Sequence, residues 1–416
     1  MAVDGAGATY ATGFYTSVFF VRGRAFANRG RADAWVGKLD PAGQLLWVQT
    51  MGGAEAEEGR AIALAGDSVF VAGVFQSQPM TAGAFVLTAS SAAVPDVFVA
   101  RLNATSGDVL WARAFGGDGA DGVASVVAAN GLVYLAGVSH SSAFPLYAEK
   151  VADAGAAAGG GGTAYLATLA AETGAIVKAE ALPALRTLSR MEVDRRTGAV
   201  FLVGTDYVAR VGAWRTSLEG SSVTEPRRGL ALDPSSRRLF VAAPFDGSSI
   251  TLGGPSSSGV VLENAGAGFF DSYVACLYAA TGEVQWARRI GGARSDLVVG
   301  LAEDPVTGGV YAAGTFEGQL SSLPAPWGKL TAAGSAADAF LVRYDGEGRA
   351  LGAWRFGSSL AESVSDVAVD RVGGVYLTGR TDGTAQFGPQ GVTQQFVARV
   401  VAVRCMHAPR WMYMYT

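Results

Sequence analysis

Few residues in this chain have the chemistry of acid–base or nucleophilic catalysis. The 416 residues include two histidines, His140 and His407, and two cysteines, Cys276 and Cys405. General-base catalysis usually involves a histidine or a close carboxylate cluster, and His140 lies in the serine-rich stretch 138–142, which is typical of a solvated loop. The cysteines are far apart and match no zinc or disulfide spacing. We therefore predict no catalytic residue and no bound cofactor.

Acidic residues recur in two patterns that have the chemistry of metal ligands. An aspartate precedes one type of predicted strand in four places: Asp33, Asp96, Asp271 and Asp338. A ring of carboxylates is one interpretation, but an aspartate at the turn before a strand ordinarily accepts hydrogen bonds from backbone amides. The acidic stretches 55–58 and 118–121 lack the dense oxygen spacing of calcium loops. We predict structural aspartates, solvated loops and no metal site.

Large aromatic residues recur once per repeating segment in a predicted strand that follows a short turn. They are Trp47, Trp111, Trp286 and Trp354. A large amphipathic ring at a repeated position suits packing between neighbouring repeats. We predict that these tryptophans dock adjacent repeats, with ligand stacking as the alternative.

The segments that carry these residues are copies of a pair of β-hairpins, repeated about every sixty residues. The first hairpin is centred on Tyr10, Phe70, Tyr134, Phe201, Phe240, Tyr311 and Tyr376. The second begins at Trp35, Phe98, Tyr165, Tyr207, Tyr273, Phe340 and Phe396. Two hairpins make a four-stranded antiparallel unit, and units that are apolar on both faces must stack. The pattern predicts an all-β, seven-bladed β-propeller of four-stranded antiparallel blades.

The repeats predict one domain, although the length would allow two or three ordinary ones. We expect a single β-propeller over residues 1–403 and an irregular tail or poorly formed last strand over 404–416. The approximate blades are 1–51, 60–115, 123–181, 190–219, 229–290, 297–356 and 364–403.

Three segments resemble the module of SBBP-type β-propeller repeats: residues 338–345, 354–357 and 367–376. The resemblance implies a propeller fold and little chemistry, because that family is defined by its module. It also implies an extracellular or cell-surface location. Residues 281–286 are similar to the Thr-Gly-x-x-x-Trp docking motif of quinoprotein propellers, which implies that the tryptophan locks neighbouring blades together.

Composition and charge exclude some partners. The net charge of −4 and the absence of any Lys/Arg-rich run argue against nucleic acid. The longest uncharged stretch, 122–148, is interrupted by Asn130-Gly131 and Pro145, so we interpret it as a hairpin and loop rather than a membrane span. Residues 1–5 have no signal-peptide pattern. We expect a monomer.

The longest connections join the first hairpin to the second. They cover residues 74–95, 138–163, 244–270 and 315–337, whereas the fourth repeat has only Thr205-Asp206 there. Loops on a rigid scaffold often carry recognition. We predict a non-catalytic interaction module that binds a protein or carbohydrate through a loop-rich face, with a notch beside the fourth blade. Two alternatives remain open: an enzyme, quinoprotein-like or hydrolytic/lyase, that uses the central channel, and a purely architectural repeat domain.

Overall fold

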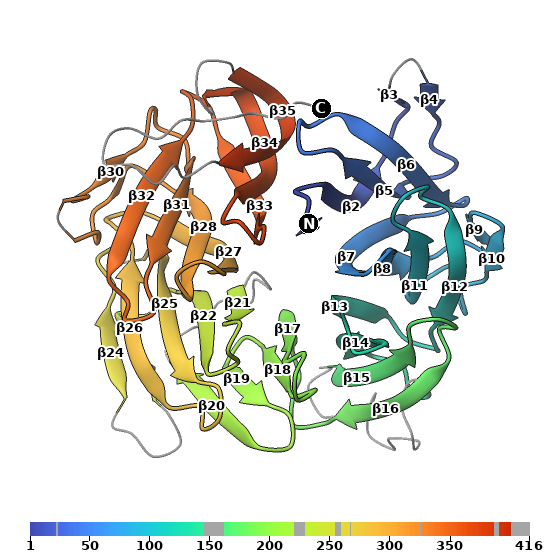
Figure 1. Ribbon diagram of the computed structural model, residues 1–416, viewed down its shortest axis with the longest axis horizontal. Coiled ribbons are helices and arrows are strands. Elements are labelled where there is room, and N and C mark those ends of the chain that lie inside the picture. Colours follow the sequence, from blue (N-terminus) through green and yellow to red (C-terminus); the bar gives the residue numbers. More distant parts are fainter. Residues whose placement is uncertain are drawn as a thin grey trace. The chain divides into compact units, whose positions relative to one another are not determined.

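The computed structural model describes residues 1–21, 24–144, 162–219, 229–253, 259–266, 268–324, 326–386 and 391–400. Within these ranges every regular element is a β-strand, labelled in Figure 1. The chain packs as two compact units. Unit 1 comprises Met1–Asp4, Ala8–Asp40 and Leu45–Gly198, and unit 2 comprises Gly5–Gly7, Pro41–Gln44 and Ala199–Thr416.

Unit 1 is built from consecutive antiparallel sheets whose strands follow the sequence order. The first sheet contains β1 (Ala2–Val3), β2 (Thr9–Tyr15), β5 (Asp33–Leu39) and β6 (Leu45–Gly52). The second contains β7 (Glu57–Ala65), β8 (Ser68–Phe75), β11 (Asp96–Asn103) and β12 (Val109–Phe115). The third contains β13 (Asp121–Ala129), β14 (Leu132–Ser139), β15 (Thr163–Ala170) and β16 (Ile176–Leu182). The short strand β17 (Arg190–Val193) ends the unit.

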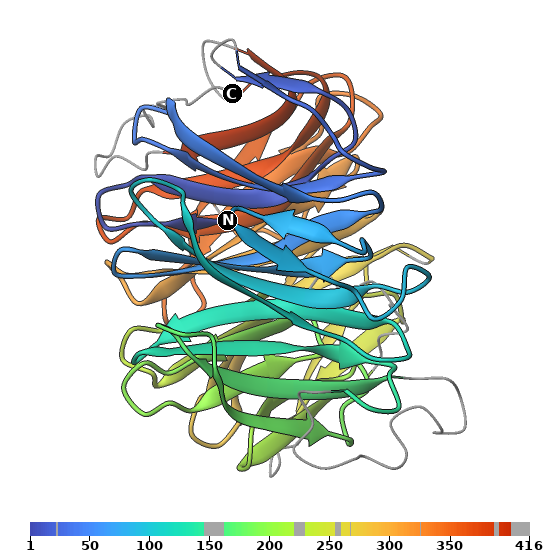
Figure 2. The ribbon, with the colours of Figure 1, turned by 90° about the vertical axis from the view of Figure 1, so that its right-hand side faces the viewer.

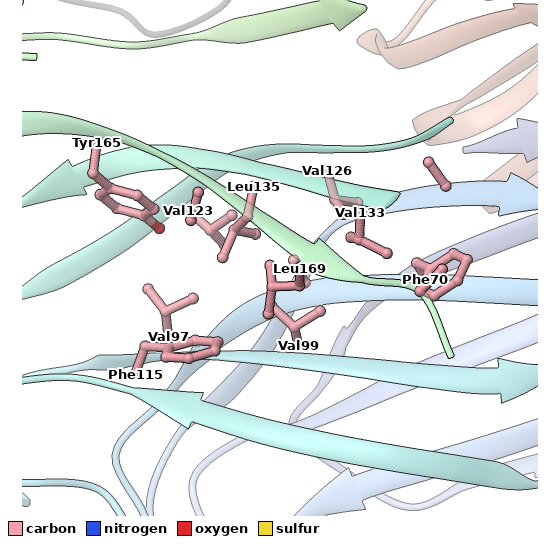
Figure 3. Close-up of a cluster of buried hydrophobic side chains, with 14 of the residues drawn as sticks. Phe70, Val97, Val99, Phe115, Val123, Val126, Val133, Leu135, Tyr165 and Leu169 are labelled. Carbon is pink, nitrogen blue, oxygen red and sulfur yellow. The ribbon is translucent and has the colours of Figure 1, made fainter. Parts of the chain in front are cut away.

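The sheets of unit 1 stack face to face through their first strands, because β7 packs against β2, β13 against β7, and β17 against β13. Figure 2 shows these blue-to-green sheets one above another. Figure 3 shows the apolar layer between the second and third sheets, where Val97 and Val99 of β11 lie near Leu135 and Leu169. Burial of such side chains on both faces of each sheet is the main force that holds the stack together.

Unit 2 repeats the same construction. Its first described strands are β18 (Val200–Val203), β19 (Tyr207–Arg210) and β20 (Trp214–Glu219). The next sheet contains β21 (Gly229–Leu232), β22 (Arg238–Phe245), β25 (Asp271–Tyr278) and β26 (Val284–Ile290). The following one contains β27 (Asp296–Asp304), β28 (Gly309–Phe316), β31 (Asp338–Tyr344) and β32 (Ala350–Phe356). The last described strands are β33 (Glu362–Val369), β34 (Val375–Gln386) and β35 (Gly391–Val400). Strand β27 packs on β21, and β33 packs on β27.

Three of the four long connections predicted from the sequence contain β-hairpins, and the fourth, residues 138–163, lies largely outside the described residues. Strands β9 (Met80–Ala82) and β10 (Phe85–Leu87) extend the preceding sheet, since Ala82 pairs with Met51 of β6. Strands β23 (Ser249–Leu252) and β24 (Val260–Glu263) do the same, since Leu252 pairs with Leu218 of β20. An outer strand presents unpaired backbone N–H and C=O groups, so an adjacent hairpin that pairs with it is stabilising.

Two further hairpins lie in equivalent connections. Strands β29 (Gln319–Leu320) and β30 (Leu330–Thr331) pair with each other, and Leu320 forms a bridge to Gly292, just after β26. Strands β3 (Phe19–Val21) and β4 (Arg24–Phe26) form a separate two-stranded sheet. The connection between β18 and β19 is a tight turn, in which Gly204 N donates to Tyr207 O at 3.0 Å.

The all-β class and the four-stranded antiparallel sheets predicted from the sequence are confirmed. Consecutive sheets stacked through their first strands are the packing of β-propeller blades. In the part of the chain that the structure describes, no helix is long and apolar enough to cross a membrane. The predicted tail 404–416, with Cys405 and His407, lies outside the described residues.

Candidate functional site

The recurring tryptophans lie at the contacts between consecutive sheets. Three of the four, Trp47, Trp111 and Trp286, project from the fourth strand of their repeats, and each indole N–H donates to a backbone carbonyl in the second hairpin turn of the next sheet. The donor–acceptor distances are 3.2 Å from Trp47 to Ala104, 3.0 Å from Trp111 to Ala171, and 2.8 Å from Trp286 to Gly346. Each indole therefore contributes both apolar packing and a directional hydrogen bond to the contact between two consecutive sheets.

A glycine in the receiving turn makes room for each ring. Gly174 has a φ of +68°, and a Cβ added there would lie 2.9 Å from the ring of Trp111. Gly348 has a φ of +78°, and its Cβ would lie 2.6 Å from the ring of Trp286. Any other residue would meet both backbone strain and a steric clash. The Thr-Gly part of the docking motif thus receives the tryptophan of the preceding repeat, not its own.

Trp214 makes the same contact, although the sequence marked it only as a weak copy. Its indole donates to Ala279 O at 3.2 Å, and its ring lies 2.5 Å from the Cβ position of Gly282. A short turn before Trp214 made the repeat hard to recognise. Trp354 is half-buried and packs in the core beside β33, and the segment that follows β35 lies outside the described residues.

The four recurring aspartates accept hydrogen bonds from the turns that precede their strands, as predicted. The donor amides are Arg29 to Asp33 at 3.2 Å, Ser90 to Asp96 at 2.6 Å, Ala265 to Asp271 at 2.9 Å, and Ala333 to Asp338 at 2.9 Å. All four carboxylates are buried. A glycine just after the outer strand closes over each, and a Cβ on Gly116 would lie 1.9 Å from Asp96.

A second buried acid begins the first strand of the following sheet in four places: Glu57, Asp121, Asp296 and Glu362. Glu57 and Asp121 lie in the stretches 55–58 and 118–121, so their burial in strands corrects the prediction that these stretches are solvated loops. Burial raises the pKa of Asp121 to about 6, and the hydroxyls of Ser139 and Ser141 oppose that rise. Each of these four junctions therefore holds two acidic side chains from different repeats. Three of the acids follow a Gly-Gly pair in the sequence, whereas Glu362 follows Gly357-Ser358.

Lys38, Arg101 and Arg343 occupy one equivalent position, a recurring basic position in the third strand of their repeats, and make contacts within and between sheets. Lys38 Nζ donates to Ala104 O of the next sheet at 3.0 Å. Arg101 pairs with Glu172 at 2.5 Å. Arg343 instead pairs with Asp304 of its own sheet at 2.5 Å. These groups hold turns in place.

The remaining candidates for chemistry are engaged or buried. His140 is exposed, and its Nδ1 lies 3.0 Å from Ala120 O. Cys276 is fully buried, and burial raises the pKa of its thiol to about 12, which disfavours the nucleophilic thiolate. Among the described residues, no group of three or more His, Cys, Asp or Glu side chains is arranged to hold a metal ion.

Exposed apolar side chains cluster in sequence around the β3–β4 hairpin. Phe14, Val18 and Phe20 have exposed fractions of 50%, 49% and 72%. The neighbouring aromatic rings support the hairpin, since Phe19 stacks on Phe26 with centroids 4.9 Å apart. We call residues 14–21 and 24–26 the aromatic segment. It presents large aromatic side chains to solvent, whereas the exposed apolar side chains of the β9–β10 and β23–β24 hairpins, Val86 at 65% and Val261 at 54%, are aliphatic.

No family model and no curated protein matches the chain. Among solved structures, the quinohemoprotein alcohol dehydrogenase from Comamonas testosteroni is 11% identical with a TM-score of 0.45, over 92% of this chain and 66% of that one. The WD40 domain of Neurospora crassa Pan2 is 10% identical with a TM-score of 0.43, over 90% and 93%. BamB from Moraxella catarrhalis is 12% identical with a TM-score of 0.38, over 88% and 92%. Similarity at this level does not extend to ligand or activity, and the resemblance to SBBP-type repeats stays a prediction.

Proposed function

We propose that the chain is a seven-bladed β-propeller that acts as a non-catalytic interaction module and binds a protein or carbohydrate partner. The seven copies of the two-hairpin pattern support the blade number. The buried acids, the basic position and the contacting tryptophans all serve turns and sheet junctions. In this proposal, Trp47, Trp111, Trp286 and Trp354 are blade-docking residues, and function depends on a surface.

The observation that carries the proposal is the exposure of Phe14 and Phe20 in the aromatic segment. Exposed aromatic rings bury large apolar area at low entropic cost in protein interfaces, and they stack on the apolar faces of sugars. Because the β9–β10 and β23–β24 hairpins pair with outer strands, the proposal places the binding surface on the aromatic segment.

The proposal is tested by protein pull-down and glycan-array binding with the purified chain. The variant is Phe14→Ser/Phe20→Ser, and the matched control is Val86→Ser, which removes an exposed apolar side chain (65%) from the paired hairpin β9–β10. We expect the partner captured by the unmodified chain to be lost with the double variant and kept with the control. Capture that survives the double variant would refute the aromatic segment as the site. A chain that captures neither class of ligand would refute the module.

A further inference from the structure

Three of the four buried acids that begin a first strand share a stabilising arrangement. Each of the three pairs in register with a residue of the second strand, and a hydroxyl-bearing residue stands either there or two positions later. Glu57 lies opposite Phe75 and is served by Ser77, whose amide donates at 3.2 Å. Glu362 lies opposite Thr381, whose hydroxyl donates at 2.9 Å.

The third member of the set follows the same rule with two hydroxyls. Asp121 lies opposite Ser139, which donates to it, and Ser141 Oγ donates at 2.9 Å. The amide of Gly117 adds a bond of 3.0 Å. Buried carboxylates need such donors, because an ionised carboxylate without them loses its hydration with no compensation.

Asp296 lacks this arrangement. It lies opposite Phe316, and Gly318 stands two residues later, so neither position carries a hydroxyl. Asp296 has no exposed surface, and neither of its carboxyl oxygens accepts a well-formed hydrogen bond from any residue that the structure describes. Its backbone is nonetheless fixed, since Ser272 Oγ donates to Asp296 O at 2.8 Å.

The charges around Asp296 oppose its ionisation. Asp271, on β25, is also fully buried, and its Oδ1 is likewise without a well-formed hydrogen bond among the described residues. Its Oδ2 is engaged by Arg289 Nη1 of β26 at 2.8 Å. Glu317, after β28, adds a second negative charge near Asp296. The remaining charged neighbour, Arg294, is exposed and lies beside Gly318.

We propose that Asp296 is held protonated next to the Asp271 carboxylate, and that the junction between the β21–β22–β25–β26 sheet and the β27–β28–β31–β32 sheet is a pH-sensitive joint. In the protonated state the carboxyl O–H of Asp296 is available to donate a hydrogen bond to the Asp271 carboxylate. The two side chains then carry one negative charge between them. Loss of that proton leaves two buried carboxylates of like charge, of which Asp271 is paired with Arg289. The joint then loosens, because repulsion and desolvation act on the same contact.

Burial, and then the charge of Asp271, raise the pKa of Asp296 to about 8 from its ordinary value of 3.8. The folded chain therefore binds a proton that the unfolded chain releases between these two values. By linkage, the contribution of Asp296 to the free energy of unfolding is complete below its pKa in the unfolded chain and is lost as pH rises through its pKa in the folded chain. We therefore expect the free energy of unfolding to decline between about pH 4 and pH 8.

A proton fits this position better than a metal ion. The backbone amides of Gly292 and Glu317 approach Asp296 and lower its pKa, but by less than burial and the charge of Asp271 raise it. Amide N–H groups repel a cation, which requires surrounding oxygen atoms. The described residues bring no third acidic ligand into a suitable arrangement. The inference is independent of the proposed binding function, because it concerns a junction in unit 2.

The test is urea unfolding from pH 5 to pH 9 for the unmodified chain, Asp296→Asn and Asp121→Asn. Asparagine mimics the neutral carboxyl, so we expect Asp296→Asn to remove the decline between pH 6 and pH 8. Proton release on unfolding at pH 6 should fall by about one per molecule. Asp121→Asn should be destabilised, because an NH2 donor replaces one of the two oxygens that accept from Ser139, Ser141 and Gly117. An unchanged pH slope in Asp296→Asn would overturn the proposal.

Infrared spectroscopy provides a second measurement that does not depend on how the variants fold. The unmodified chain should show a protonated-carboxyl band at pH 7.5, above the pKa of Asp121 (about 6) and of Glu192 (about 7), that disappears toward pH 9. Absence of this band at pH 7.5 would overturn the proposal. If Ca²⁺ also raised the unfolding midpoint of the unmodified chain but not of Asp296→Asn, the occupant would be a cation.

Discussion

Replacing Gly348 by alanine should separate the docking contact from simple turn strain. Gly348 adopts φ +78° and lies under the ring of Trp286, while Gly308, in the other hairpin turn of the same sheet, adopts φ +67° with nothing within 4 Å of its Cβ position. Both substitutions meet the same backbone penalty. Only Gly348→Ala also meets the indole.

The magnitudes follow from these two terms. A left-handed conformation costs a residue with a Cβ about 1–2 kcal/mol, which is the full expected loss for Gly308→Ala. The new methyl of Gly348→Ala would lie 2.6 Å from Trp286 Cδ2. Trp286 is only 7% exposed and is tied to Gly346, so it has little room to move. Overpacking of this kind costs a further 1–3 kcal/mol or so, for an expected total of about 2–5 kcal/mol.

Equilibrium unfolding in urea, followed by far-UV circular dichroism and tryptophan fluorescence, measures the difference. Both sites lie in unit 2, so the two variants report on the same part of the chain. Gly308→Ala serves as the matched control for backbone strain. Equal losses in the two variants would refute the idea that the glycine is required by the docked indole.

Two other predictions concern buried groups. Trp286→Phe should lower the free energy of unfolding by at least about 1 kcal/mol, because the carbonyl of Gly346 loses its hydrogen-bond donor. The control is Trp327→Phe, which should cost less in the same urea assay, because the indole N–H of Trp327 has no hydrogen-bond partner among the described residues. Comparable losses in the two variants would argue against the N–H hydrogen bond as the source of the destabilisation. Cys276 should react very slowly with a thiol reagent in the folded chain and rapidly in urea, because the thiol is buried with its pKa raised to about 12; rapid labelling of the folded chain, followed by absorbance, would contradict this burial.

Sequence reasoning recovered the features that depend on local pattern. Alternating strands and glycine turns predicted the antiparallel sheets, because residues a few positions apart set a hairpin. The aspartate turns were also predictable, since Asp33 and its equivalents bond to amides only a few residues away. The contact partners of Trp111 and its equivalents were not, because the receiving carbonyl is 60 residues further on.

The hairpins within the long connections could not be predicted from the sequence, for the same reason. Residues 80–87 contain a β-hairpin whose pairing partner, β6, belongs to the preceding repeat. Nothing within that stretch distinguishes a hairpin that extends another sheet from an exposed loop. Asp296 was equally hidden, because its unusual environment arises from missing hydroxyls on a neighbouring strand.

The tryptophan contact gives each repeat a direction. An outer-strand indole such as Trp111 reaches forward to the next repeat, and a hairpin such as β9–β10 reaches back to the preceding one. The repeats that contain Trp111 and Trp286 therefore each carry one complementary half of two different joints, because β9–β10 and β23–β24 reach back from them. A gene duplication that inserted a whole repeat would find a matching surface on both sides. Such an array can gain or lose whole repeats during evolution without needing a new interface. A repeat whose elements followed the opposite order would match neither neighbour.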